Sequence, residues 1–385
     1  MVAAEVKTDS GGHGGWTSQG SLEELALLAD TAGAVVVGRV VQRLERPSPA
    51  YYIGRGKVQE VAAQRQALGC NLIIFDDELA PSQQRNLENV LKVKVLDRTA
   101  LILDIFAQHA RTREGCLQVE LAQHEYLLPR LRGQWQHLER LEGRIGTRGP
   151  GETQIETDRR LIRRKIQRLK AELEQVRCQR ALYRRRRARQ GMPVVSLVGY
   201  TNAGKSTLMR ALSGANVLVE DKLFATLDPV TRRVRLPGGG RFLLTDTVGF
   251  IQKLPTQLVA AFRATLEELA EADLLLHAVD ITHPNAAEQS QTAEDTLAEL
   301  GLADKPRITV LNKVDLLTRR DGQPIAGLEE LEGFEPSLRY WRPEAVLASA
   351  AKGWGLDELL RRIEAALTGQ EWTGVIEQRR QEAAG

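Results

Sequence analysis

The feature that most constrains this chain is the segment GYTNAGKST at residues 199–207, which directly follows the apolar run VVSLV at 194–198. A GxxxxGKS pattern placed between a strand and a helix is typical of a phosphate-binding loop. Gly199 and Gly204 allow the backbone to curl so that its amide groups face phosphate oxygens. The sequence therefore predicts a nucleotide-binding α/β domain.

Within this loop, different side chains suit different parts of a bound nucleotide. Lys205 is predicted to reach the β and γ phosphates, and Ser206 to offer its hydroxyl to Mg²⁺. Asn202 can help to hold a monovalent cation such as K⁺ against the phosphates, which offsets negative charge that develops during hydrolysis. The residues predicted to line the phosphates are Gly199, Tyr200, Thr201, Asn202, Ala203, Gly204, Lys205, Ser206 and Thr207.

Further apolar runs predict a doubly wound, mostly parallel sheet, and two motifs stand where such strands end. DTVG at 246–249 follows the run FLLT, so that Asp246 can act on Mg²⁺ through water and the Gly249 amide can approach the γ phosphate. NKVD at 312–315 follows RITVL, and the Asp315 carboxylate can accept two hydrogen bonds that guanine offers and adenine does not. These motifs predict Mg-GTP as the ligand.

The other residues expected at the nucleotide belong to neighbouring loops. Asn312 is expected to brace the site, Lys313 to pack its stem along the base, and a backbone amide near Ala350 to meet the guanine carbonyl. Beyond the phosphate loop, the predicted nucleotide contacts are Phe224, Ala225, Thr226, Asp246, Thr247, Val248, Gly249, Asn312, Lys313, Asp315, Ser349, Ala350 and Ala351. The predicted catalytic residues are Lys205, Thr226 and Gly249, and the predicted metal ligands are Ser206, Thr226 and Asp246.

Two positions in the predicted site leave alternatives open. Thr226 is our choice for the threonine that joins Mg²⁺ and the γ phosphate in the GTP state, and Thr231 competes with it. Phe250 follows DTVG at the place where many GTPases carry a glutamine that orients the attacking water. Because phenylalanine cannot do so, either hydrolysis is slow until a partner supplies polar groups, or another element of this chain supplies them.

The first part of the chain has a different pattern. Residues 1–20 are rich in Gly, Ser and Thr and are predicted to form a flexible tail. From Ser21 onward, apolar runs alternate with helix-like stretches, which predicts a small α/β unit with parallel strands. The predicted strands are 34–38, 72–76 and 93–97, and the predicted helices are 57–68 and 82–91.

Two heptad seams then predict an antiparallel helical hairpin. The seams are formed by Leu117, Leu121, Leu128, Leu131, Trp135 and Leu138, and by Ile162, Ile166, Leu169, Leu173 and Val176. The segment GRIGTRGPGETQ at 143–154 is the predicted turn between them. Pro129 should kink or interrupt the first helix, because proline cannot donate the backbone hydrogen bond.

The second helix of this hairpin is markedly basic. Residues 154–190 contain fourteen Lys or Arg against four acidic residues. Such an arm suits binding to a nucleic-acid backbone, since each neutralised phosphate releases counterions. A solvated charged face is the alternative interpretation, and the residues alone leave both open.

Composition and cysteine usage limit the number of domains and the cellular compartment that we expect. A chain of 385 residues with 42% hydrophobic residues can bury a core in each of two or three domains. Cys70, Cys116 and Cys178 lie far apart, which argues against a disulfide framework or a zinc site and fits a reducing cytosol. Without a leader or an apolar spanning run, we expect a cytoplasmic protein. The expected organisation is a tail (1–20), a small α/β domain (21–104), a basic helical hairpin (105–191), a GTP-binding domain (192–368) and a polar tail (369–385).

These residues resemble the HflX family of ribosome-associated GTPases, which belongs to the group whose catalytic glutamine is replaced by a hydrophobic residue. The motifs GYTNAGKST, FATLDP, DTVGFI and NKVD carry part of the resemblance. The more specific part is YYIGRGKV at 51–58, IIFDDELAPSQQRNLE at 73–88, VLDRTALILDIFAQHARTREG at 95–115 and GTRGPGETQIETDRR at 146–160. The match covers nearly everything from Ser21 onward.

The resemblance implies that the N-terminal part binds RNA of the large ribosomal subunit, with the GTP state governing binding and release. It also implies a role in splitting or rescuing stalled or idle ribosomes, and we expect the free protein to be monomeric. The RNA contacts are expected at Arg148, Arg159, Arg160, Arg163 and Arg164. An RNA-binding scaffold with a regulatory, slowly hydrolysing guanine-nucleotide site is the alternative. A GTPase of tRNA modification is a weaker third reading, because it would need a catalytic domain of its own.

Overall fold

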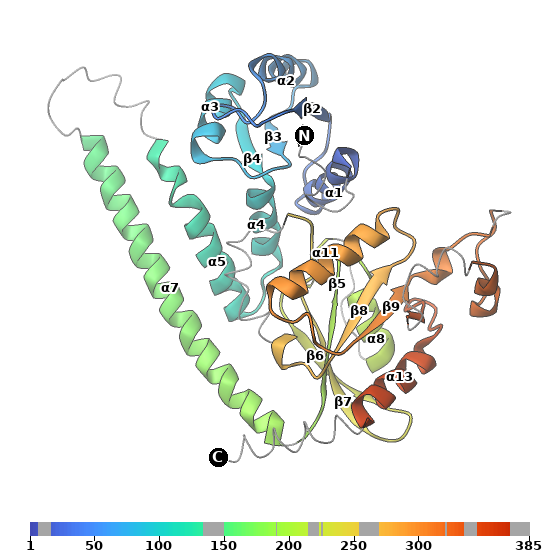
Figure 1. The fold of residues 1–385 in the computed structure, drawn as a ribbon. Helices are drawn as coiled ribbons and strands as arrows, with labels where there is room; N and C mark the ends of the chain where they lie inside the picture. The colour runs from blue at the N-terminus through green and yellow to red at the C-terminus, as the bar shows by residue number, and fades with distance from the viewer. Residues whose placement is uncertain are drawn as a thin grey trace. The chain divides into compact units, whose positions relative to one another are not determined.

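The computed structural model describes residues 1–6, 17–133, 150–189, 191–214, 223–224, 226–253, 269–319, 322–334 and 345–369. For 6, 132–133, 150–155, 181–189 and 332–334 it describes the backbone alone. The chain divides into two compact units, whose elements are coloured along the sequence in Figure 1. The first unit is Met1–Val176 with Lys253–Ala261, and the second is Arg177–Gln252 with Phe262–Gly385.

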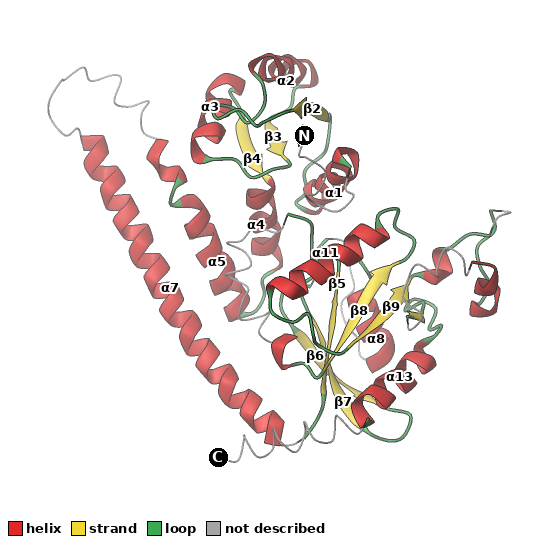
Figure 2. Ribbon diagram, in the orientation of Figure 1, coloured by secondary structure: helices red, strands yellow, loops and turns green. Residues whose placement is uncertain are grey.

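The first unit contains a parallel sheet with helices packed against it (Figure 2). Its described strands are β1 (Val2–Val6), β2 (Val40–Leu44), β3 (Leu72–Phe75) and β4 (Lys94–Asp97), in the spatial order β2-β1-β3-β4. The helices between them are α1 (Ser18–Thr31), α2 (Arg55–Leu68), α3 (Pro81–Leu91) and, after β4, α4 (Arg98–His109). Side chains of the sheet, α2 and α3 share one apolar core, in which Val58, Leu87 and Val95 are buried. The predicted α/β unit with parallel strands is confirmed.

The ends of these helices follow from local sequence chemistry. Pro81 is the first residue of α3, where its missing N–H is not needed. The Asp97 side chain accepts a hydrogen bond from the Ala100 amide at 2.8 Å and so caps α4. Gly69 ends α2 in the left-handed conformation, which glycine adopts without strain. The predicted helices at 57–68 and 82–91 are therefore present and begin slightly earlier than expected.

Two predictions for the start of the chain are wrong. Residues 1–20 do not form only a tail, because β1 lies between β2 and β3 and Val2 is 1% exposed. Glycine and serine at positions 10–20 dominate the composition of the segment and conceal the short strand before them. The run at 34–38 is not a strand in the structure, and β2 begins at Val40, which pairs with Val2. Residues 34–38 therefore precede the part of the chain that pairs with β1.

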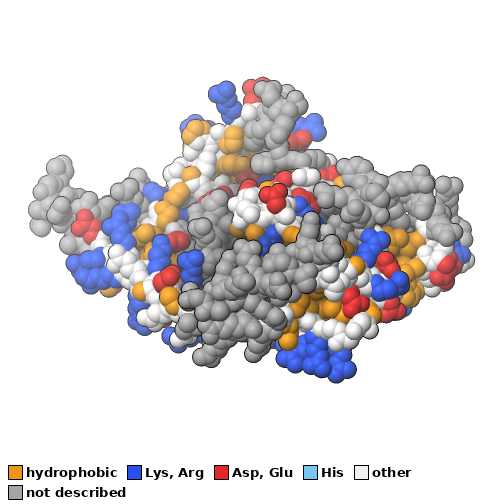
Figure 3. Space-filling view, turned by 60° about the horizontal axis from the view of Figure 1, so that its bottom comes forward, with side chains coloured by type: hydrophobic (Ala, Val, Ile, Leu, Met, Phe, Trp, Pro, Cys, Tyr) orange, Lys and Arg blue, Asp and Glu red, His pale blue; other side chains and the backbone are white. Residues whose placement is uncertain are grey.

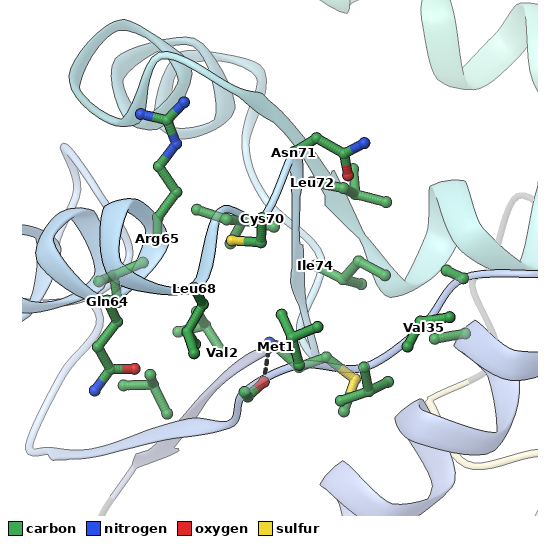
Figure 4. A pocket seen from close by; sticks show the side chains of 18 of the residues that line it. Met1, Val2, Val35, Gln64, Arg65, Leu68, Cys70, Asn71, Leu72 and Ile74 are labelled. Carbon is green, nitrogen blue, oxygen red and sulfur yellow. Dashed lines mark hydrogen bonds between the residues drawn. The ribbon is translucent and has the colours of Figure 1, made fainter.

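A cavity of about 530 Å³ lies beside the start of β1. Figure 4 shows Met1, Leu68 and Ile74 around it, with the Met1 ammonium donating to a backbone carbonyl. That carbonyl belongs to Gly38, 2.7 Å away. Val2 lies opposite Phe75, the last residue of β3, so most of β3 extends past the start of β1.

The predicted helical hairpin is present in the described residues. Its arms are α5 (Arg113–Leu127) and α7 (Pro150–Arg189), and Leu117, Leu121, Leu128, Ile162, Ile166, Leu169, Leu173 and Val176 form one apolar cluster between them. The first arm ends before Pro129 and continues as the short 3₁₀ helix η1 (Arg130–Gly133), as expected from proline. Trp135, Leu138 and Arg148 lie outside the described residues. The predicted turn at 143–154 is too long, because α7 already begins at Pro150.

The second unit has a six-stranded sheet among its described residues, in the order β10-β9-β8-β5-β7-β6. The strands are β5 (Val194–Gly199), β6 (Val230–Arg235), β7 (Arg241–Asp246), β8 (Leu274–Asp280), β9 (Arg307–Asn312) and β10 (Val346–Leu347). All neighbouring pairs are parallel except β6 with β7, which confirms the doubly wound, mostly parallel fold. The sequence VTRRVR of β6 was not predicted as a strand, because an edge position tolerates its charged residues.

Helices complete this second unit. They are α8 (Lys205–Ser213), α11 (Ala286–Glu299) and α13 (Leu356–Thr368), with the 3₁₀ segments η2 (Val314–Leu316) and η3 (Leu328–Phe334). The central strand β5 is buried on both faces, and α8 leads directly from its C-terminal end. None of the helices in the described part of the chain combines the length and the apolar character that crossing a bilayer requires.

A buried ionic cluster joins α1, β3 and α4 in the first unit. The Arg98 guanidinium lies 2.5 Å from Glu24 Oε1 and 2.8 Å from Asp76 Oδ1. Ser21 donates to Asp76 Oδ2, and the Lys253 ammonium lies 2.6 Å from the same oxygen. Burial by itself raises the pKa of Asp76, but Arg98 and Lys253 outweigh it and hold the pKa at about 2. This carboxylate therefore adds stability above its ordinary pKa of 3.8, and that stability is lost as the pH falls toward 2.

Replacing Arg98 with leucine should lower the free energy of unfolding of the first unit by about 3–5 kcal/mol, because the buried Glu24 carboxylate loses the Arg98 charge and Asp76 retains Lys253 but loses Arg98. Thermal and denaturant unfolding measure the change. Arg43→Leu is the control, since its ion pair with Glu5 has side chains 81% and 44% exposed. That variant should change stability by less than about 1 kcal/mol. Equally small changes in both variants would contradict the role assigned to the cluster.

Candidate nucleotide-binding site

The segment 199–204 forms a tight loop between β5 and α8 whose glycines are required by close approaches. Gly199 has φ +136°, and a Cβ there would lie 2.2 Å from the carbonyl oxygen of Ala278 on β8. Gly204 has φ +84°, and a Cβ there would lie 2.3 Å from Asn312 Nδ2. Residues with side chains fit neither position. The loop shape is therefore set by the neighbouring strand ends.

Lys205 opens α8 and turns its side chain back over the loop. Its ammonium donates to the carbonyl oxygens of Gly199 at 3.1 Å and Tyr200 at 2.7 Å, and the side chain is buried. Burial lowers the pKa of Lys205 to about 8, although Asp246 acts in the opposite direction. A buried cation with so little compensation is suited to an anionic ligand such as a phosphate.

Three oxygen-bearing side chains predicted as metal ligands lie together beside this lysine. Ser206 Oγ donates to Asp246 Oδ2 at 2.6 Å, and Thr226 Oγ1 lies 2.8 Å from Ser206 Oγ and 3.2 Å from the same carboxylate oxygen. Burial raises the pKa of Asp246, and its Oδ1 is buried with no hydrogen-bond partner in the described part of the chain. Hydroxyl and carboxylate oxygens are the ligands that Mg²⁺ prefers, so this set fits the ion.

The structure separates the two candidate threonines. Thr226 lies at the oxygen cluster, whereas Thr231 lies on β6 with its hydroxyl 3.0 Å from that of Thr245 on β7. Of the two candidate threonines, Thr226 is the one whose hydroxyl lies beside both Ser206 and Asp246.

At the other end of the site, Asn312 connects two loops. Its side-chain nitrogen donates to the Ala203 carbonyl at 2.9 Å, and its oxygen accepts from the Ala350 amide at 3.0 Å. The Ala350 amide therefore faces Asn312, whereas we expected an amide near this position to face the guanine carbonyl. Asp315 lies on η2, half-buried, and Lys313 precedes it with φ +66°. The NKVD segment is thus held against the phosphate loop.

The segment after DTVG is joined to the phosphate loop by its backbone. The Phe250 amide donates to the Gly199 carbonyl at 3.0 Å, and the Thr201 amide donates to the Phe250 carbonyl at 2.8 Å. The Phe250 side chain is buried, so it does not offer a polar group to solvent. A Cβ at Gly249 would lie 2.8 Å from the backbone Cα of Thr201, which explains a glycine at this position. Sequence reasoning missed Tyr200 as a brace: its hydroxyl accepts from the Gln252 amide at 2.8 Å.

Other predicted site residues have varied positions. Thr247 directs its hydroxyl to the Leu197 carbonyl of β5 at 2.7 Å, and Ser349 is fully buried beside the Asn312 brace. Asn202 is exposed at the loop tip, with φ +60°. Phe224 is buried, and Ala225 lies outside the described residues.

Of the predicted RNA-contacting arginines, Arg159, Arg160, Arg163 and Arg164 lie on α7, and Arg148 lies outside the described residues. Arg160, Arg163 and Arg164 are exposed, and Arg159 is half-buried. In Figure 3, Lys and Arg side chains lie at the left of the view, where the hairpin runs, with acidic side chains among them. One such acidic partner is Glu172, which accepts from the Arg168 side chain at 2.7 Å. The face is therefore basic but not uniformly so.

Three family models match successive parts of this chain. Residues 19–107 match a model described as "GTP-binding GTPase N-terminal", and residues 109–187 match "GTP-binding GTPase Middle Region". Residues 194–313 match a model described as "50S ribosome-binding GTPase".

Known proteins resemble the chain over most of its length. The GTPase HflX of Lacrimispora saccharolytica is 49% identical over 354 residues, which are 92% of this chain and 80% of that protein. The GTPase HflX of Escherichia coli is 44% identical over 352 residues, which are 91% of this chain and 79% of that protein. Among solved structures, the crystal structure of a GTP-binding protein from Sulfolobus solfataricus in complex with GDP matches with a TM-score of 0.45 and 25% sequence identity. The match covers 96% of this chain and 99% of that protein chain.

Replacing Thr226 with alanine should lower the rate of GTP hydrolysis at least about tenfold, because a removed transition-state contact of one hydrogen bond is worth this much or more. GDP affinity should change little, since the threonine is expected to contact the γ phosphate side. Thr231→Ala is the matched control and should retain the parent rate within about twofold. Single-turnover hydrolysis measures both. A larger loss in Thr231→Ala would reverse the assignment.

Proposed function

Because this chain belongs to the HflX family of GTPases, we propose that it is a ribosome-coupled molecular switch that splits or rescues stalled or idle ribosomes. It is a GTP-hydrolysing enzyme by family. The further proposal is that the GTP state permits binding to the large subunit and that hydrolysis resets binding. We predict that the protein works in the cytoplasm. We also predict that it is monomeric when it is not bound to the ribosome.

The observation that carries the nucleotide part of the proposal is that the half-buried hydroxyls of Ser206 and Thr226 meet the buried Asp246 carboxylate. The buried Lys205 ammonium interacts electrostatically with the same carboxylate. Lys205 would hold the β and γ phosphates through its ammonium. Ser206, Thr226 and Asp246 would hold Mg²⁺, which supplies positive charge that neutralises the phosphates when bound. At the opposite end Asp315 would accept two hydrogen bonds from guanine, with Asn312 keeping its loop in place.

Hydrolysis by this site should be slow in the free protein. Phe250 stands where a glutamine would orient water, and its side chain is buried away from the loop surface. The groups that would still stabilise the charge developing during hydrolysis are the Lys205 ammonium, the backbone amides near Gly249 and a monovalent cation at Asn202. A partner that orders the loops around the γ phosphate would then raise the rate.

The large ribosomal subunit is the partner that we propose. The family model over residues 194–313 carries the description "50S ribosome-binding GTPase", and α7 presents exposed arginines that suit RNA phosphates. The alternative is an RNA-binding scaffold whose nucleotide site is regulatory. The buried Phe250 side chain cannot orient water, which favours slow turnover and so supports the scaffold as the second candidate function.

Isolated large ribosomal subunits should stimulate GTP hydrolysis by the purified protein at least about tenfold, as partner contributions to GTPase sites commonly exceed this. The blank is Lys205→Ala, which should show no turnover above background. Turnover assays in potassium buffer, with and without subunits, measure the effect. Equal rates with and without subunits would contradict the switch and favour the scaffold.

The same assay tests the basic helix. Reversing Arg160, Arg163 and Arg164 to glutamate should remove the stimulation and leave the intrinsic rate unchanged, because these residues are proposed to contact RNA. Reversal of Arg232, Arg233 and Arg361, which are exposed in the second unit, is the control for a general loss of positive charge. Equal losses in both sets would indicate a nonspecific effect of charge.

Potassium should stimulate the intrinsic rate more than sodium at equal ionic strength, and Asn202→Ala should abolish the difference. The reason is that a potassium ion can offset the charge that develops on the phosphates only while the Asn202 side chain holds the ion beside them. Asn285→Ala, outside the loop, is the control. A potassium effect that survives Asn202→Ala would remove this residue from the cation site.

A further inference from the structure

A carboxylate that none of the nucleotide motifs includes lies against the guanine-binding loop. Asp280 is the last residue of β8 and pairs in register with Asn312, the last residue of β9. Its Oδ2 atom lies 2.7 Å from the ammonium of Lys313. The two side chains are 13% and 23% exposed, so the pair is largely shielded from solvent.

The second oxygen of Asp280 is also engaged. Oδ1 accepts hydrogen bonds from the Thr282 amide at 3.1 Å and from the Thr282 hydroxyl at 2.6 Å. Both donors lie two residues along the same chain segment, so the carboxylate is held by its own turn as well as by the lysine. Neighbouring groups of the protein therefore give the Asp280 carboxylate a defined orientation.

Lys313 has a backbone that needs such support. Its φ of +66° lies in the left-handed region, which residues with side chains adopt only when their surroundings hold them there. Its Cε atom lies 3.9 Å from the position that a Cβ on Gly204 would occupy. The methylene stem of Lys313 thus passes beside the phosphate loop, with its charged end tied to Asp280.

We propose that Asp280 is a positioning residue for purine binding: by holding the Lys313 ammonium, it fixes the lysine stem as a flat apolar surface on which the base packs. Thr282 supports this arrangement by orienting the carboxylate. The inference rests on the proposed guanine site. It deepens that proposal by separating two tasks, since the Lys313 stem meets the face of the base and Asp315 reads its edge.

This division predicts how affinities change with the base. Hypoxanthine has the purine face and the ring N1–H of guanine but lacks the exocyclic amine. Loss of the packing surface should weaken GDP and inosine diphosphate by the same factor. Loss of the carboxylate that reads the edge, as in Asp315→Asn, should instead change the ratio between the two nucleotides.

The test measures dissociation constants of GDP and inosine diphosphate for the full-length protein by titration calorimetry. Asp280→Asn should weaken both about tenfold, equivalent to about 1.4 kcal/mol, with an unchanged ratio. Lys313→Met keeps an apolar stem but removes the ammonium and should show a similar loss. The double variant should lose no more than either single variant, because the two residues act as one unit.

Controls separate positioning from general stability. Thr282→Val should cause a smaller loss in the same direction, and it keeps the carboxylate if Asp280→Asn proves unstable. Glu358→Gln, which removes a surface ion pair with Arg361 on α13, should leave both dissociation constants unchanged.

The outcomes are distinguishable. Additive losses in the double variant, or affinities within twofold in Asp280→Asn and in Thr282→Val, would overturn the role of Asp280. Failure of the parent protein to bind GDP would instead overturn the proposed guanine site itself.

Discussion

The side-chain amide of Asn312 is the interaction on which the nucleotide site depends. One buried group donates to the phosphate loop at Ala203 and accepts from the turn at Ala350, so it joins the two ends of the site. Leaving either partner unpaired in this buried position would cost about 1–3 kcal/mol. The same amide lies against Gly204, which is why only glycine fits there. The Asn312 side chain therefore joins the phosphate end and the base end into one structure.

Burial of two opposite charges gives this structure its preference for ligands. Lys205 and Asp246 are both buried, and burial is the strongest influence on the pKa of each group. Because burial disfavours the charged form, the pKa of Lys205 falls and the pKa of Asp246 rises. A phosphate beside the lysine and a divalent cation beside the aspartate would each restore the charge that burial penalises. A nucleotide carrying its own metal ion satisfies both needs at once.

Phe250 shows how the same segment can support binding while leaving hydrolysis to other groups. Its backbone pairs with Gly199 and Thr201, which positions DTVG against the loop, and its buried side chain stabilises that arrangement. We propose that the rate of hydrolysis then depends on cations and on the loops that a partner orders. The first unit has an apolar core of its own and the ionic cluster around Arg98.

The sequence by itself determined the nucleotide chemistry, the parallel sheets and the hairpin seams, because spacing, periodicity and turn residues are local properties that the fold must satisfy. It did not determine β1, whose burial depends on strands that flank it in space, nor the choice between Thr226 and Thr231, which depends on which loop reaches Asp246. Asp280 was missed for the same reason: a lone aspartate at a strand end has no signature in sequence. Only the pairing of β8 with β9 brings its carboxylate to the neighbouring loop, because contacts between distant segments are set by strand order and register.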